Sequence, residues 1–428
     1  MAMTESQVAG LELERVMDVV PVAFEQDGTF YREVEKRDVE KISARDMRIP
    51  IKLKPGGRTG SFDPDGGGLG RGDGPTYDKA VINTINVRHA VEITQKANWA
   101  TDDKRKAVLS ALRKAMVDEF DEFRAELDRY TQNAGDGVLA NITAVATSGG
   151  KDLLTLSTTD GFTARMLRYG NYYGVFDTTL ATKRTWTGGT ALNGEGQIDL
   201  YDPDNNQVRM NVTATSAGAI NTDKLVVSGL TPTPVWLYGV PYHHNNSSTG
   251  TWLGFTRSAT PEIRASGVNA AGNLALTHAR LAVNKIYMRV GFDKKKYSLE
   301  AWMHPCQVQA YEQLGQLVHH IERPSGTKDP GLSLYFDDNM QLAGARVRKH
   351  ANWNKTRIDL IIKELWGRAE MHPAGFYEAD GKKVFEARSS DGGVAAALIF
   401  YFVCSWNLFM MNPAAGSYIY GLTIPTGY

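Results

Sequence analysis

A glycine-rich segment between two alternating stretches decides the fold: residues 46–94 read DMRIPIKLKPGGRTGSFDPDGGGLGRGDGPTYDKAVINTINVRHAVEIT. Apolar and polar residues alternate over 46–54 and again over 84–94, and this period of two predicts a strand in each stretch. The inward-facing positions would be Met47, Ile49, Ile51, Leu53, Ile85, Val87, Val91 and Ile93. The glycines crowded into 55–76 indicate a flexible tip. We therefore expect the two strands to pair as one long arm.

Such an arm has no core of its own. A two-stranded hairpin is marginally stable in water, and its open edges invite pairing with other chains. Its apolar face must be covered by the rest of the chain or by another copy. The sequence therefore favours self-assembly.

A long amphipathic helix is predicted directly after the arm, from Thr101 to Asn133, with Thr101 as N-cap and Gly135 just beyond its end. Its apolar residues are spaced by three and four: Leu109, Leu112, Met116, Phe120, Phe123, Leu127 and Tyr130. Basic residues gather early (Lys104–Lys106) and acidic residues late, against the preference of the helix dipole. Either a partner of complementary charge or a plain solvated face accounts for this order.

The remaining chain alternates strands and helices, which indicates an α+β fold. Residues 1–45 are expected to form an N-terminal arm with a short helix over Thr4–Val20, and the Thr-, Asn- and Gly-rich residues Phe162–Gly267 an inserted β-rich domain. After it we predict a helix Thr277–Val290 ended by Gly291, a strand Tyr297–Met303, a helix opened by Pro305, a strand Arg357–Lys363 and late strands in Val394–Met411 and Tyr418–Ile424.

Composition places the chain among ordinary globular proteins, with 428 residues, 42% of them apolar and 22% charged. Lysine plus arginine equals aspartate plus glutamate, 48 each, so any contact with DNA must be local and weak. Cys306 and Cys404 are expected to be buried thiols, compatible with a reducing cytoplasm. The start of the chain has no signal-peptide pattern, so export is not expected. Ser405 and Asn407 interrupt the apolar stretch Val394–Met411, which favours buried strands over a membrane segment.

No motif nominates a chemical site. The GxxxxGK phosphate loop, the HExxH zinc motif, a CxxC pair and the GxSxG elbow are all absent, so we predict no catalytic, cofactor-binding or metal-binding residues and no enzyme. Arg71-Gly72-Asp73 and the sequon at Asn246 are interpreted as chance matches. The adjacent pairs His243-His244 and His319-His320 suit hydrogen bonding or the surface better than metal binding, because neighbouring side chains point to different sides.

The order of these elements, together with four stretches of sequence, resembles the major capsid proteins of tailed bacteriophages, the Hong Kong 97-type fold. The stretches are ISARDMRIPIKL (42–53), LALTHARLAVNKIYMRVG (274–291), EAWMHPCQVQAYEQL (300–314) and NPAAGSYIYGL (412–422). The resemblance covers nearly the whole chain apart from 162–267, where only the general habit of carrying an extra β domain matches.

The resemblance implies a division into six parts: an N-terminal arm (1–45), an extended loop with a glycine-rich tip (46–98), a peripheral domain with the spine helix (99–161), the inserted β-rich domain (162–267), an axial domain (268–365) and a return to peripheral strands (366–428). The extended loop would overlie the next subunit, and the axial domain would surround the five-fold and six-fold centres.

The resemblance also implies the function. The chain would assemble with itself into pentamers and hexamers, and these into an icosahedral head that encloses double-stranded DNA by weak, non-specific contact. Further expected partners are a separate scaffolding protein, since no long charged helical extension is present, and the portal; decoration proteins are compatible with the resemblance. The expected location is the virion, after assembly in the host bacterial cytoplasm, without a membrane. Lys52 and Lys54 lie near the loop tip, but no motif matches the lysine–asparagine cross-link of some family members.

Two alternatives remain open at this point. A shell of the same fold could be an encapsulin-like nanocompartment that holds an enzyme instead of a genome. A carbohydrate-binding or adhesive phage structural protein is the other, because Trp236, Tyr242 and Trp252 could stack on a sugar beside the polar stretch HHNNSSTGTW.

Overall fold

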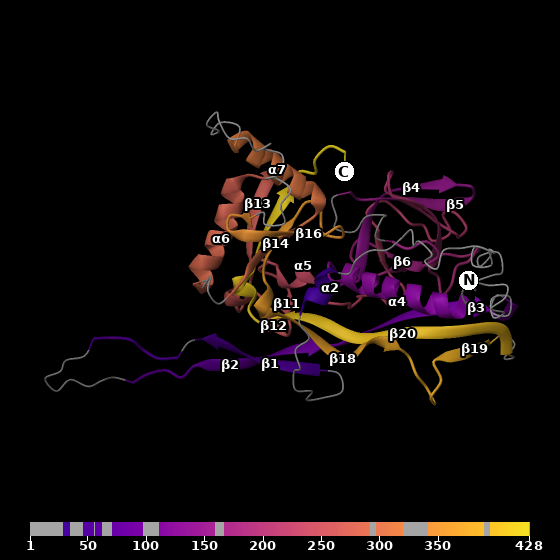
Figure 1. Cartoon of the computed structure of the whole chain (residues 1–428), viewed down its shortest axis with the longest axis horizontal. Helices are drawn as coiled ribbons and strands as arrows, with labels where there is room; N and C mark the ends of the chain where they lie inside the picture. Colours follow the sequence, from indigo (N-terminus) through magenta and orange to yellow (C-terminus); the bar gives the residue numbers. More distant parts are fainter. Residues whose placement is uncertain are drawn as a thin grey trace, which may run out of the picture.

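The structure is a computed structural model that describes residues 29–34, 46–54, 56–61, 71–96, 111–158, 167–291, 297–319, 341–388 and 394–427. It is a mixed α/β fold with several sheets and few helices (Figure 1). Its α-helices in these ranges include α2 (Thr29–Glu33), α4 (Ala111–Tyr130), α5 (Val240–His243), α6 (Leu276–Val290) and α7 (Pro305–His319). Single 3-10 turns occur at η3 (Pro261–Ile263), η5 (Lys363–Leu365) and η6 (Pro413–Ala415). The predicted helix Thr4–Val20 lies outside the described residues.

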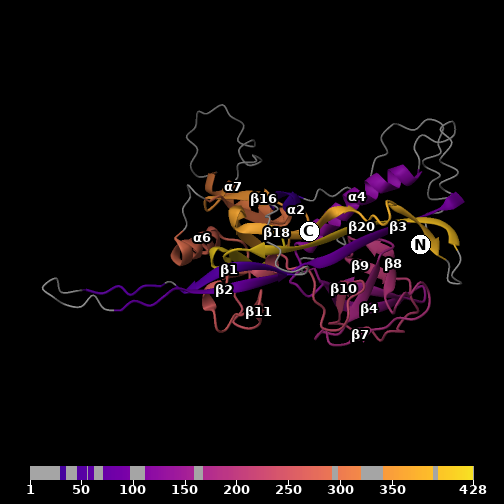
Figure 2. The same cartoon turned by 90° about the horizontal axis from the view of Figure 1, so that it is seen from below.

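A four-stranded sheet runs along the molecule, with α4 lying along it (Figures 1 and 2). Its strands are β3 (Ile85–Thr94), β18 (Trp366–Phe376), β19 (Val384–Arg388) and β20 (Val394–Met410). The long strand β20 is central and pairs with each of the other three. Its second half, 404–410, is buried at every position, so both faces of the strand are covered there. The stretch that could suggest a membrane segment is therefore a sheet strand, and no described helix is long and apolar enough to cross a membrane.

The predicted pairing of the arm was wrong in its second strand. The first strand, β1 (Asp46–Lys54), pairs with β2 (Thr76–Asn83), whereas β3 pairs with β20 from Ile85↔Trp406 to Thr94↔Ala397. The sequence of β2 lacks the regular two-residue period of β3, but β2 is nearer to the tip and closes the hairpin. The apolar positions of β3, such as Ile93, instead join the main hydrophobic core. The extended hairpin therefore spans 46–83.

The predicted helix Thr101–Asn133 corresponds to α4 within the described residues, since 101–110 lie outside them. The helix ends at Tyr130, and the side chain of Asn133 then forms hydrogen bonds with the backbone of the loop that follows. Its Oδ1 accepts the N–H groups of Gly135 and Gly137 at 2.8 and 3.0 Å. On the inner face, the rings of Phe120 and Phe123 lie 5.2 and 6.1 Å from that of Phe402 on β20.

A six-stranded sheet with α6 and α7 beside it forms the second body of the fold (Figure 1). The strand order is β13 (Ser266–Gly272), β21 (Ser417–Leu422), β17 (Ile358–Ile362), β14 (Leu299–Met303), β16 (Ala345–Lys349) and β15 (Gln341–Leu342). The predicted helix 277–290 is confirmed: Gly291 ends it in the left-handed conformation (φ 61°), which glycine adopts without a Cβ clash. The predicted strands at 297–303 and 357–363 and the helix opened by Pro305 are confirmed as well.

The end of the chain corrects a second prediction. Residues 366–428 were all placed with the peripheral strands, but β21 joins the six-stranded sheet between β13 and β17. After β20 the chain turns through η6 and reaches this sheet at Gly416. A Cβ at Gly416 would lie 2.5 Å from His244 Nε2, so a side chain here would clash with that buried ring.

A third body is built almost entirely of strands. It contains β4 (Val138–Ser148), β5 (Lys151–Leu156), β6 (Tyr172–Phe176), β7 (Lys183–Arg184), β8 (Gly196–Asp202), β9 (Gln207–Met210) and β10 (Lys224–Val227). Because β10 pairs with both β4 and β6, the order β10-β4-β5-β9-β8-β6 closes into a ring, which removes exposed sheet edges. The ring begins before the predicted insertion 162–267 and ends well before residue 267. The alternating residues 138–156 complete the ring, whereas 240–267 pack against the other bodies.

Candidate assembly surfaces

The base of the hairpin is anchored on the chain's own core. Ala80 and Ile82 are fully buried in a cluster that includes Trp252, Leu253 and Phe409, part of it supplied by the small hairpin β11 (Thr251–Trp252) and β12 (Phe255–Thr256). The N–H of Val81 also donates to the carbonyl of Leu253 at 3.0 Å. The expectation that the whole arm lacks a core was therefore wrong for its base.

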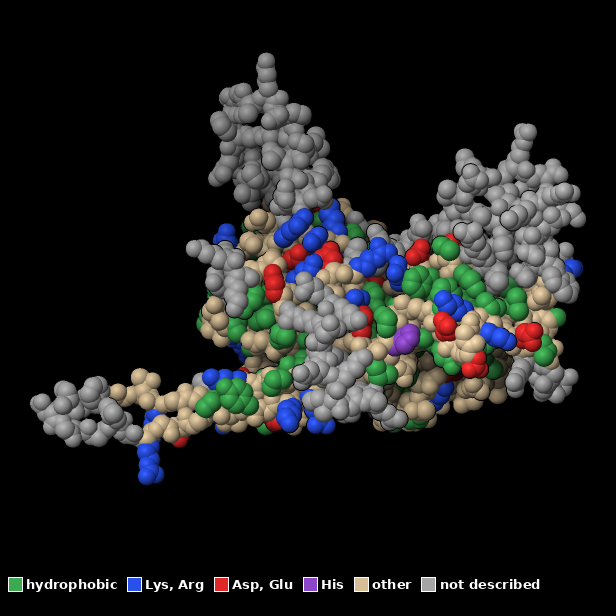
Figure 3. Space-filling view, turned by 60° about the horizontal axis from the view of Figure 1, so that its bottom comes forward, with side chains coloured by type: hydrophobic (Ala, Val, Ile, Leu, Met, Phe, Trp, Pro, Cys, Tyr) green, Lys and Arg blue, Asp and Glu red, His purple; other side chains and the backbone are tan. Residues whose placement is uncertain are grey.

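In the distal half of the hairpin this cover is only partial: Ile51 and Leu53 are partly buried against the cluster, whereas the facing strand is exposed. Residues 76–79 are all exposed, and Tyr77 presents 63% of its surface to solvent. The hairpin projects well beyond the rest of the molecule (Figures 1 and 2), and on the face in Figure 3 it carries Lys and Arg side chains. At the described part of the tip, the N–H of Gly57 donates to the carbonyl of Asp73 at 2.8 Å. A two-stranded projection of this kind needs a surface on another molecule to become rigid.

The short segment 29–34 is inserted where the sheets and α4 meet. The ring of Phe30 lies edge-on to Trp302, Trp353 and Trp366, with centroids 5.0, 5.5 and 6.1 Å away. Beside it, the carboxylate of Glu33 lies 3.4 Å from Arg348 and 3.3 Å from Lys363. This part of the predicted N-terminal arm is therefore held by both aromatic packing and ion pairs.

A buried carboxylate links that segment to α4 and to the six-stranded sheet. Asp128 on α4 is fully buried and accepts the N–H of Tyr31 at 2.8 Å. Its other oxygen lies 2.7 Å from His350 Nε2, in the turn after β16. Since His350 Nδ1 accepts the N–H of Asn352, Nε2 carries the proton and donates to Asp128. Three parts of the chain that are distant in sequence thus share one hydrogen-bonded group.

Much of the acidic run on α4 is used within the chain. Arg168 forms ion pairs with Glu119, Glu122 and Glu126, and His89 on β3 lies 2.9 Å from Glu119. Burial alone would raise the pKa of Glu119, but the hydrogen bond from His89 and the charge of Arg168 outweigh it and hold the pKa below its usual value. These glutamates are therefore not free for a partner. The basic residues Lys104–Lys106 lie outside the described residues.

The pair His243-His244 is buried and hydrogen-bonded. His243 Nδ1 accepts the indole N–H of Trp252 at 3.0 Å, so Nε2 donates to the carbonyl of Leu408 at 3.2 Å. Burial lowers the pKa of His243 to about 3, and it also lowers the pKa of His244, whose Nδ1 donates to Asp359. The expectation of hydrogen-bonded histidines is confirmed for this pair. The side chains of the other predicted pair, at 319–320, are outside the described residues.

The remaining candidate groups are structural as well. Both cysteines are buried free thiols, and burial raises the pKa of Cys306 to about 11 and that of Cys404 to about 12. Trp252 is fully buried and Trp236 is 7% exposed, so neither offers a flat face to a sugar. In the described ranges no group of three or more His, Cys, Asp or Glu side chains could hold a metal ion. Arg71, Gly72 and Asp73 are exposed near the hairpin tip.

Comparison with solved structures finds the same fold. A chain of the cyanophage A-1(L) capsid asymmetric unit aligns with a TM-score of 0.54 at 12% identity, covering 98% of this chain and 99% of that one. The capsid of a native GTA particle (TM-score 0.46, 10% identity, 99% of each chain) and the holo-SrpI encapsulin complex from Synechococcus elongatus PCC 7942 (TM-score 0.46, 8% identity, 98% and 96%) also align. No protein-family model and no curated protein matches the sequence. The resemblance to the capsid proteins of tailed phages is thus confirmed at the level of the fold.

Proposed function

We propose that this chain is the major capsid protein of a tailed bacteriophage, and that many copies close into an icosahedral shell around double-stranded DNA. The observation that carries the proposal is the alignment over almost the full length of both chains with a phage capsid protein. Identity of 12% fixes only the fold, so the role itself is our inference.

The geometry supports a role based on contacts between copies. The hairpin 46–83 has a firmly anchored base and a distal half that is only partly covered, as expected of an element that lies on a neighbouring subunit. We assign α4 as the spine helix, the six-stranded sheet with α6 and α7 as the axial domain, and the ring of strands 138–227 as the insertion. Interfaces in obligate assemblies of this kind bury on the order of 2,000 Å² or more.

The proposal assigns no chemistry to the chain and treats it as a structural protein rather than an enzyme. Its partners would be other copies of itself, a separate scaffolding protein, the portal and packaged DNA. The equal numbers of basic and acidic residues, 48 of each, suit a shell that encloses DNA without strong electrostatic binding to its phosphates. Assembly would take place in the host cytoplasm, and the final location would be the virion.

The test is direct. The purified protein, with and without its genomic neighbours, is separated by size exclusion with light scattering, and the heavy fraction is imaged by electron microscopy. Closed polyhedral shells, or pentamers and hexamers able to form them, are expected. A stable monomer or small dimer under all conditions would refute the proposal. Particles from infected cells that hold an enzyme rather than DNA would favour a nanocompartment of the same fold.

The need for a scaffolding protein is tested in the same experiment. We expect the protein alone to give few or irregular shells and the co-expressed neighbour to restore closed ones. Efficient closure by the protein alone would show that no separate scaffold is required.

A further inference from the structure

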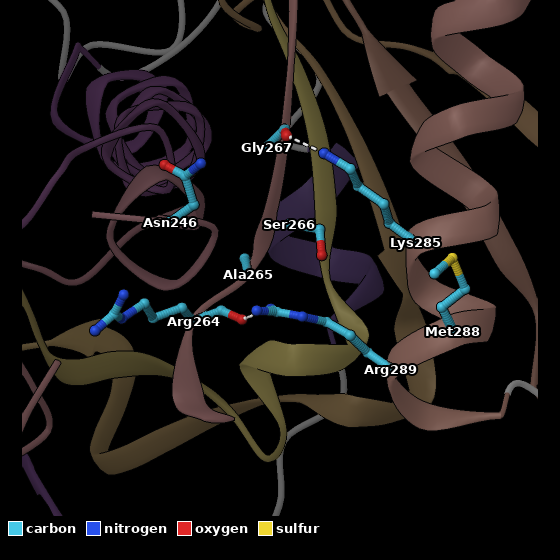
Figure 4. A pocket seen from close by; sticks show the side chains of 8 residues that line it. All are labelled: Asn246, Arg264, Ala265, Ser266, Gly267, Lys285, Met288 and Arg289. Atoms are coloured by element: carbon cyan, nitrogen blue, oxygen red, sulfur yellow. Dashed lines mark hydrogen bonds between the residues drawn. The ribbon is translucent and has the colours of Figure 1, made fainter. Parts of the chain in front are cut away.

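A groove lies between α6 and the chain segment that enters β13. Its volume is about 350 Å³, and Figure 4 shows the side chains around it. It is lined by Asn246, Arg264, Ala265, Ser266, Gly267, Lys285, Met288 and Arg289. The groove thus lies along the edge strand of the six-stranded sheet, on the side opposite to β21.

The cations of the groove are held in place by backbone carbonyls. Lys285 Nζ donates to the carbonyl of Gly267 at 2.8 Å, and Arg289 donates to the carbonyl of Arg264 (Figure 4). Each side chain is fixed by these bonds and still has N–H groups to spare, because an ammonium carries three and a guanidinium five. Among the described residues, no carboxylate forms an ion pair with either of them or with Arg264. The groove therefore offers positive charge without an internal counterion.

The adjoining face of α6 carries two exposed apolar side chains. Met288 is 84% exposed and Leu281, two turns earlier on the same side of the helix, is 47% exposed. Exposed apolar side chains beside a charged groove are typical of a protein interface, where apolar contacts supply affinity and charges supply orientation.

The charge of the whole chain indicates what fits there. Because the chain is neutral overall, surplus positive charge on one face is balanced by surplus negative charge elsewhere on the same molecule. The described part of the distal hairpin does not fit, since its charged residues are mostly basic: Lys52, Lys54, Arg58, Arg71, Asp73, Asp78 and Lys79. An acidic segment outside the hairpin, on a neighbouring copy, is complementary.

We propose that this groove binds a carboxylate-bearing segment of a second copy of the chain, with Met288 and Leu281 covered by the same contact. This inference rests on the proposed self-assembly and specifies one of its interfaces. The carboxylate would accept hydrogen bonds from Lys285 and Arg289, and charge-assisted bonds of this kind are about twice as strong as neutral ones.

Zero-length cross-linking tests the contact itself. DNA-free shells are assembled from equal amounts of ¹⁴N- and ¹⁵N-labelled chains and treated with a carbodiimide, which joins a lysine amine to a carboxylate in contact. Mass spectrometry should find Lys285 joined to an aspartate or glutamate in peptides of mixed label. Lys349 lies 3.9 Å from Glu312 in the same chain and is the control that should give same-label links. If the control links form but Lys285 gives none of mixed label, the proposal is wrong.

Charge reversal tests its importance for assembly. K285E and R289E are expected to lower the yield of closed shells at least tenfold while the unassembled chains keep the wild-type circular dichroism spectrum. The matched control is R280E, on an exposed position of the same helix outside the groove. Wild-type yields for both groove variants would overturn the inference, and so would normal shells that package less DNA, because the groove would then contact phosphates. Failure of the wild-type chain to assemble would instead refute the proposed function.

Discussion

Replacing Phe30 with alanine should destabilise the chain strongly, because this one side chain joins several parts of the fold. It is 2% exposed and packs edge-on against three tryptophans from β14, the turn after β16 and β18. Truncating a buried phenylalanine costs about 3–5 kcal/mol, which combines lost burial with the cavity left behind. Indole rings are rigid and cannot collapse into the space, so we expect the upper half of that range, about 4–5 kcal/mol.

The assay is urea unfolding of the unassembled protein, followed by tryptophan fluorescence, since three of the reporting indoles surround the substituted position. F30L is the matched control. It keeps an apolar side chain in the pocket and should cost about 1–2 kcal/mol. The two variants should also differ in the fluorescence of the folded state, because only alanine leaves room for water near the indoles.

If F30A lowers the free energy of unfolding by less than about 1 kcal/mol and leaves the folded-state fluorescence unchanged, the reasoning is refuted. It would mean that residues 29–34 do not occupy the tryptophan pocket of their own chain in solution. A large loss in assembled shells, but not in unassembled protein, would instead place the segment in the pocket of a neighbouring copy.

Three further predictions follow from the described contacts. Because burial lowers the pKa of His243 from 6.5 to about 3, the unfolded chain binds a proton below pH 6.5 that the folded chain does not; this one group should lower the unfolding free energy by roughly 1 kcal/mol for each pH unit between pH 6 and 4, and H243Q should show a smaller slope in urea titrations. Y77S should leave the unfolding free energy of the unassembled protein within about 0.5 kcal/mol of wild type yet reduce shell yield severalfold, unlike V235S at a comparably exposed position. Mature particles boiled in detergent should run as monomers only, since no motif supports a cross-link at Lys52 or Lys54; ladders of higher mass would contradict this.

Local patterns in the sequence predicted several of the elements correctly. The helix 276–290 was predictable because its apolar residues recur every three or four positions and Gly291 follows its last turn. Both signals depend only on residues close together in the sequence. The strands around 299–303 and 358–362 were predictable for the same reason. The buried, hydrogen-bonded state of His243 and His244 was anticipated only in part, since their partners Leu408 and Asp359 lie more than a hundred residues away.

The pairing of strands was the main feature that the sequence patterns predicted wrongly. Residues 85–94 alternate more regularly than 76–83, yet it is 76–83 that pairs with 46–54, so the local pattern pointed to the wrong partner. The bounds of the β-rich body were missed in the same way, because 138–156 complete a ring whose other strands follow much later. Pairing is decided by which apolar faces can be buried together, and that is a property of the whole fold.

The sequence by itself determined the broad class of the protein: a neutral chain of both helices and strands without a catalytic motif, with a glycine-tipped hairpin that suits self-assembly. Only the tertiary structure decided where the hairpin ends, that Phe30 and Asp128 join the bodies, and that Lys285, Met288 and Arg289 line one groove. The physical reason is that helix and turn signals arise from neighbouring residues. Cores and grooves arise from faces brought together across hundreds of residues, and only the folded chain specifies those contacts.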